Sequence, residues 1–199
     1  MINVLNNNIT HITLLGNCQS RALTWFIKQL DTNFDVAWLC PEPFRNTRWG
    51  SSPVVCGENI TVITDTVQGH NRLRQTDFLI YQDMNSSITK CYNTDQLEKH
   101  AAHAKKITIS SFRLDSDNPY NHLFTGMVAR EKRNNIDIRA SEIVKKYGDS
   151  VTTINRSVMH PNTFYFLEVV RKICGITGWK FYTKEMYDRY LNEVHPFGR

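Results

Sequence analysis

The sequence predicts an α/β fold of three layers, in which a mainly parallel open sheet is covered by helices on both faces. Short segments rich in Ile, Val, Leu or Phe alternate along the chain with longer amphipathic segments. Near-continuous apolar strands with helices between them are typical of a parallel sheet buried on both faces. The 199 residues, of which 41% are hydrophobic, suit a single domain (1–199) with a sizeable core.

The strands and helices are expected in alternation from residue 11 onward. The expected strands are 11–15, 35–39, 60–64, 77–81 and 106–110. The expected helices are 19–30, 94–104, 139–147, 162–174 and 184–194. Two long stretches, 40–59 and 112–137, contain prolines, glycines and mixed charges and are expected to be irregular. Long loops of this kind are commonly binding loops, and those that follow parallel strands gather where ligands bind.

Apolar spacing and end signals support four of the helices. In the first helix the apolar residues are three or four positions apart, which is the spacing of one helix face: Leu23, Phe26, Ile27 and Leu30. Asn93, three residues before Gln96, resembles a capping box at the start of the second helix. The third helix ends before Gly148, as expected for a glycine that follows a helix. The buried face of the fourth is expected to be Phe166, Val169, Val170 and Ile173.

Composition narrows the class of protein. The chain begins without the features of a signal peptide, and no stretch approaches the roughly 20 apolar residues of a membrane span, so we expect a cytoplasmic protein. Five cysteines without a Cys-x-x-Cys pair indicate reduced thiols and no metal site. The net charge of +5 fits either a solvated surface or a groove for a polyanionic cofactor. Nucleic acid is not expected as a partner, because no zinc-finger spacing, RNP-type strand or dense basic helix occurs.

The most informative segment is Leu-Leu-Gly-Asn-Cys-Gln-Ser-Arg, residues 14–21. Here an apolar strand stops at Gly16 and a helical pattern begins, which places Cys18 at a strand-to-helix junction. Free N–H groups and the dipole of a helix N-terminus favour negative charge, so we expect Cys18 to be biased toward the nucleophilic thiolate. The alternative is a small buried cysteine packed under the turn. The polar neighbours Asn17, Gln19 and Arg21 favour the active-site interpretation.

A second constellation precedes the fourth helix. Pro161 is expected at the first helical position and disposes His160 to an extended conformation at the helix N-terminus. The helix dipole disfavours imidazolium there, and a neutral imidazole is what a general base requires. The alternative is a surface or capping histidine. Asn162 follows in the same motif, and a nucleophile and base far apart in sequence can be assembled by the fold.

A third group of polar side chains follows a mid-chain strand. Gln82 and Asn85 are expected at the same edge of the sheet as Cys18, where their amides would donate to a developing oxyanion. Capping of the loop is an equal alternative.

The Gly16-Asn17-Cys18-Gln19 and His160-Pro161-Asn162 motifs, with Tyr81-Gln82 ending a strand, resemble the WcbI family of capsular polysaccharide biosynthesis proteins. More distantly, the layout is similar to that of SGNH hydrolases, with Cys18 in place of their serine and Ser157 in place of their late aspartate. The resemblance implies an SGNH/flavodoxin-like sheet and an O-acetyltransferase that uses acetyl-CoA as cosubstrate and a glycan as acceptor. It implies Cys18 and His160 as catalytic residues, with Gly16, Asn17, Gln19, Gln82, Asn85 and Asn162 around the oxyanion and substrate. Arg21 and Arg113 are the candidates to hold the CoA phosphates.

Three other functions remain open at this point. An SGNH-like esterase would use the same Cys–His pair with water as the acceptor. A non-catalytic glycan- or nucleotide-binding domain would be favoured by a buried, unreactive Cys18. A sulfotransferase with a nucleotide phosphosulfate donor would need no cysteine nucleophile.

Overall fold

The computed structural model describes residues 9–40, 60–83, 92–112, 122–148, 160–194 and 196. Its centre is a five-stranded, all-parallel sheet in the order β3-β2-β1-β4-β5. The five expected strands are confirmed, with ends that differ by one residue or so. They are β1 (Thr10–Leu15), β2 (Phe34–Leu39), β3 (Thr61–Ile63), β4 (Phe78–Gln82) and β5 (Lys105–Ile109).

The strand order indicates at which edge of the sheet a ligand site is expected. The chain runs outward from β1 through β2 to the short β3, and then returns to build β4 and β5 on the other side of β1. Ile138 extends the β5 side through a parallel bridge to Ile109. The order β2-β1-β4-β5 followed by this bridge is that of a flavodoxin-like sheet, to which β3 adds an outer edge strand. In such sheets ligands bind beyond the carboxyl ends of the two strands at which the order reverses, here β1 and β4.

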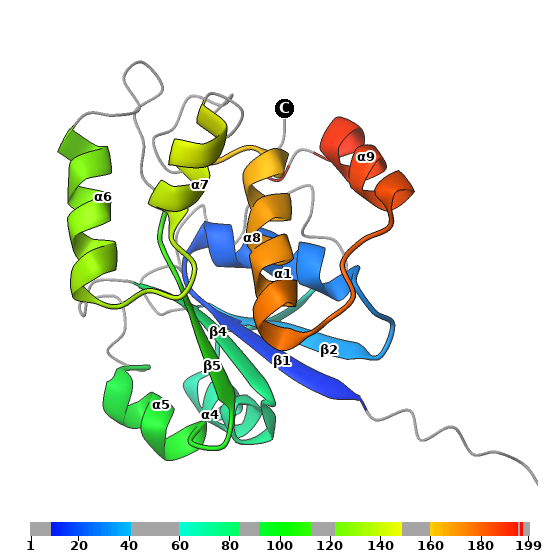
Figure 1. Cartoon of the computed structure of the whole chain (residues 1–199). Helices are drawn as coiled ribbons and strands as arrows, with labels where there is room; N and C mark the ends of the chain where they lie inside the picture. Colours follow the sequence, from blue (N-terminus) through cyan, green and yellow to red (C-terminus); the bar gives the residue numbers. More distant parts are fainter. Residues whose placement is uncertain are drawn as a thin grey trace, which may run out of the picture.

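Helices cover both faces of the sheet, so the three layers expected from the sequence are confirmed. Figure 1 shows α1, α6, α7, α8 and α9 on one side of the sheet and α4 and α5 on the other. Their bounds are α1 (Cys18–Lys28), α4 (Thr66–Gln75), α5 (Thr94–His100), α6 (His122–Arg133), α7 (Ala140–Tyr147), α8 (Thr163–Thr177) and α9 (Lys184–Glu193). In the part of the chain that is described, no helix is long and apolar enough to cross a membrane.

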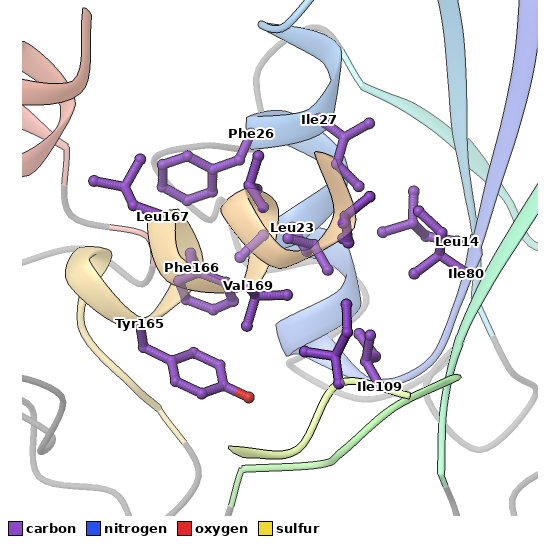
Figure 2. Packing of buried hydrophobic residues seen from close by; sticks show 14 of the residues in the cluster. Leu14, Leu23, Phe26, Ile27, Ile80, Ile109, Tyr165, Phe166, Leu167 and Val169 are labelled. Atoms are coloured by element: carbon purple, nitrogen blue, oxygen red, sulfur yellow. The ribbon is translucent and has the colours of Figure 1, made fainter. Parts of the chain in front are cut away.

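A hydrophobic core among the described residues holds α1 and α8 together above the sheet. The rings of Phe26 on α1 and Phe166 on α8 stack with centroids 5.6 Å apart. Figure 2 shows these rings beside Leu23 and Val169, with Leu14 and Ile80 of the sheet facing them. Close apolar packing of this kind fixes the two helices relative to each other and to β1 and β4. The N-termini of α1 and α8, which carry the candidate site, are positioned by this core.

Of the helices in the described ranges, α4 and α6 were not expected from the sequence. α4 is mostly polar and buries little besides Leu73 and the side chain of Arg72, so it lacks the apolar spacing of an amphipathic helix. Asp65 caps it by accepting a hydrogen bond from the N–H of Gln68. α6 lies inside 112–137, so the expectation of an irregular stretch is wrong from His122 onward. Phe124 and Met127, three residues apart, bury its inner face. Residues 113–121, like 41–59, lie outside the described ranges.

Candidate active site

Cys18 is the first residue of α1 and follows directly on the turn that leaves β1, as the sequence predicts. Asn17 is the N-cap of this helix. Its backbone is extended, and its side-chain Oδ1 accepts a 2.8 Å hydrogen bond from the N–H of Gln19. This bond identifies the oxygen end of the Asn17 amide. No acceptor for the Asn17 NH₂ group is found among the described residues.

Gly16 is required by space in this turn. A Cβ at this position would lie 2.0 Å from Ser20 Oγ and 2.4 Å from Gln82 Oε1, which no real side chain tolerates. The Gly16 carbonyl also accepts a 3.1 Å hydrogen bond from the indole N–H of Trp38 on β2. Gly16 therefore shapes the site by letting α1 approach the end of β4.

Two buried glutamines join the turn to the neighbouring strand ends. Gln82, the last residue of β4, accepts a 2.8 Å hydrogen bond from the Asn17 N–H and donates a 3.0 Å bond to Gln19 Oε1. Gln19 in turn bonds both ways with the backbone of Phe112, donating to its carbonyl and accepting from its N–H at 3.0 Å. Both side chains are at most 4% exposed. Through these hydrogen bonds both glutamines support the turn that carries Cys18.

The fold brings His160 to Cys18 across 142 residues of sequence. The Cys18 Sγ and His160 Nε2 atoms are 3.6 Å apart, a sulfur–imidazole hydrogen bond. Asn162 is the N-cap of α8 and accepts a 3.2 Å hydrogen bond from the Tyr165 N–H. α8 therefore begins at Thr163, and the expectation that Pro161 starts the helix is wrong, because the capping side chain of Asn162 sets the boundary. Asn162 positions the helix that follows His160.

The protonation states of the pair are set by burial. Cys18 is 7% exposed, and burial raises the pKa of its thiol to about 11, against the lowering effect of the Gln19 and Cys18 N–H groups and of Arg21. The expectation of a resting thiolate is therefore wrong: desolvation outweighs the helix N-terminus. Burial also lowers the pKa of the half-buried His160, so its imidazole is neutral at pH 7. The resting site is a neutral thiol beside a neutral base.

Arg21 lies one turn further along α1 and is also buried. It is 8% exposed, and its guanidinium lies 5.6 Å from the ring centroid of Trp38, in a cation–π arrangement. Its charge acts on the thiols of both Cys18 and Cys40. The positive charge of the guanidinium favours a thiolate at Cys18. Because the side chain is buried, it is not well placed to bind a phosphate group at the surface.

The remaining site predictions fall elsewhere. Asn85 and Arg113 lie outside the described residues. Trp38 and Phe112 support the turn, but the sequence analysis did not identify them. An aromatic residue in a strand, or just after one, is not part of a recognisable functional motif. Within the described ranges, no three His, Cys, Asp or Glu side chains are grouped so as to hold a metal ion.

Comparison with models of known protein families and with curated proteins gave no match for this chain. The geometry of the site, together with the sequence motifs, carries the functional argument. It defines a cysteine–histidine pair at the switch point of a doubly covered parallel sheet, with a polar turn beside the sulfur.

Proposed function

We propose that the protein is an O-acyltransferase that moves the acetyl group of acetyl-CoA to a sugar hydroxyl in glycan biosynthesis, through a thioester on Cys18. The 3.6 Å contact between Cys18 Sγ and His160 Nε2 carries this proposal. A thiol within hydrogen-bond reach of a neutral imidazole is the arrangement needed for nucleophilic catalysis by a cysteine. The resemblance of the Gly16–Gln19 and His160–Asn162 motifs to the WcbI family supports the choice of acetyl-CoA and a sugar as substrates.

In the first half-reaction His160 Nε2 takes the Cys18 proton as the sulfur attacks the acetyl carbonyl carbon. The carbonyl oxygen becomes an oxyanion, and a new S–C bond forms. When this intermediate collapses, the bond to the CoA sulfur breaks and the imidazolium returns its proton to the departing thiolate. The raised pKa of Cys18 requires such a base, because little thiolate is present at rest. Arg21 stabilises the negative charge that develops on the sulfur.

Two donors beside the sulfur suit the oxyanion. The N–H of Gln19 is already bonded to Asn17 Oδ1, and the N–H of Asn17 to Gln82. The first-turn N–H of Cys18 and the side-chain NH₂ of Asn17 remain as donors next to the sulfur-bearing residue. We assign these two groups as the oxyanion donors of the proposed reaction.

In the second half-reaction a sugar hydroxyl attacks the acetyl-thioester while His160 takes its proton. The Cys18–acyl bond breaks, and the imidazolium returns the proton to the Cys18 sulfur. An esterase would follow the same course with water as the attacking group. The two activities therefore differ in the acceptor and not in the Cys18–His160 pair.

Mass spectrometry of the intact protein after incubation with acetyl-CoA tests the proposal. One acetyl group is expected on wild-type protein, at the peptide that contains Cys18, and none on Cys18→Ser. Cys174→Ser is the matched control, because Cys174 is also a free, buried thiol. A sugar acceptor should discharge the adduct with release of acetylated sugar. Discharge by water alone would indicate the esterase, and absence of both adduct and CoA release with every acceptor would reject acyl transfer.

A further inference from the structure

A small cavity lies beneath the candidate site, between α1, α8 and the carboxyl ends of β4 and β5. Its volume is about 10 Å³, which is room for about one water molecule. Apolar side chains form much of its wall, and four residues with polar side chains complete it. The four polar ones are Gln19, Gln82, Ser110 and Tyr165.

Tyr165 on α8 is the tyrosine that lines this cavity. The residue is 4% exposed, and its ring packs edge-on against Phe112, with centroids 4.8 Å apart. Figure 2 shows the hydroxyl directed away from the α8 backbone, toward the side of the core where Ile109 lies. In the part of the chain that is described, no hydrogen bond of this hydroxyl is found, and its oxygen is not among the fully buried side-chain atoms that lack a partner, as expected for an oxygen that borders a water-sized space. Buried hydroxyls are almost always hydrogen-bonded to protein or to ordered water.

Two other residues that line the cavity, Gln82 and Ser110, can each form a further hydrogen bond. The NH₂ group of Gln82 donates one hydrogen bond, to Gln19, and has a second N–H. The hydroxyl of Ser110 makes one long bond of 3.5 Å to the Ser111 carbonyl, and its lone pairs can accept. A water-sized polar space with three such groups meets the usual requirement of two to four partners for a buried water.

We propose that this cavity is a binding site for one water molecule that links α8 to the end of β4. The water accepts hydrogen bonds from Tyr165 Oη and Gln82 Nε2 and donates one to Ser110 Oγ. Its position gives it a role in the site, because Gln82 holds the turn that carries Cys18, and Tyr165 belongs to the first turn of the helix that follows His160. Tyr165 is thus a positioning residue that acts through the water, whatever substrate the site accepts.

A crystal structure at a resolution that places single waters tests the binding site directly. A well-ordered water within about 3.2 Å of Tyr165 Oη and Gln82 Nε2 is expected in the wild-type protein. The Tyr165→Phe variant should lose this water or show it displaced toward Ser110. Ser110→Val, which fills the space with methyl groups, provides a second variant that should exclude the water. An empty cavity in the wild-type crystal overturns the proposal.

The positioning role has its own readout, which needs no substrate. Tyr165→Phe should change the alkylation rate of Cys18 by about threefold or more at a given pH, because it loosens the link between the two sides of the pair. Tyr182→Phe is the matched control: Tyr182 is also a buried tyrosine of this core, but its hydroxyl donates directly to the Phe26 carbonyl. Equal alkylation by wild type and both variants would contradict the positioning role, even if the crystal contains the water.

Discussion

The ionisation of Cys18 can be tested by alkylation as a function of pH. With a pKa of about 11, roughly one Cys18 thiol in 4,000 is ionised at pH 7.4. An ordinary cysteine of pKa about 8.5 is ionised in roughly one molecule of 13 under the same conditions. Since the thiolate is the species that reacts, iodoacetamide should label Cys18 about 300-fold more slowly than a free cysteine, before any steric effect.

The assay is a short pulse of iodoacetamide on native protein between pH 6.5 and 10, followed by digestion and mass spectrometry of the peptide that contains Cys18. The labelling rate should rise about tenfold for each pH unit across this range, because the pKa of Cys18 lies above it. An unstructured cysteine peptide of pKa about 8.5, measured in parallel, should level off above about pH 9.5. Cys174, whose pKa burial also raises to about 11, serves as an internal reference outside the site.

A labelling rate at Cys18 that is already at its plateau below pH 8 would refute this reasoning. It would mean that a Cys18 thiolate and a His160 imidazolium form an ion pair at rest, and that the helix N-terminus and Arg21 outweigh burial. Substitution of Arg21 separates the contributions further. Arg21→Gln should slow labelling at every pH below 10, since the arginine charge lowers the pKa of Cys18, and Arg21→Lys should restore part of the rate.

Three further substitutions test the site and the packing of the helices. His160→Gln should abolish acyl transfer but change the free energy of unfolding by less than about 1 kcal/mol, because a half-buried side chain ahead of a helix packs little. A large decrease in the free energy of unfolding, measured by urea denaturation, together with normal activity would show that His160 has a structural role. Gly16→Ala should cost about 1–3 kcal/mol in the same assay and reduce Cys18 reactivity, because the new methyl carbon would lie 2.0 Å from Ser20 Oγ; unchanged stability would show that the turn can relax. Glu131→Ala should destabilise the fold by about 1–3 kcal/mol, because its buried carboxylate accepts hydrogen bonds from the N–H and hydroxyl of Ser141 at the start of α7; thermal denaturation that matches wild type would contradict this role.

The local elements followed from the sequence where their patterns were strong. The apolar segments became the five strands, and the face that contains Leu23, Phe26 and Ile27 became the buried side of α1. Cys18 was placed at its strand-to-helix junction for the same reason, since a glycine after an apolar run and a helical pattern beyond it are local signals. α4 was missed because a polar helix that buries few residues has no such pattern.

The chemistry of the site depended on contacts that no local pattern contains. The sequence predicts Cys18 and His160 as candidate catalytic residues, but it does not predict their contact. The two side chains lie 3.6 Å apart because the sheet order and the packing of α1 against α8 bring two helix N-termini together. The sequence shows only that Gln82 is a polar residue at the end of a strand. Its hydrogen bonds to Asn17 and Gln19 show that it supports the turn. The protonation state of Cys18 also required the fold, because the helix N-terminus is encoded locally, whereas the desolvation that outweighs it comes from residues distant in sequence.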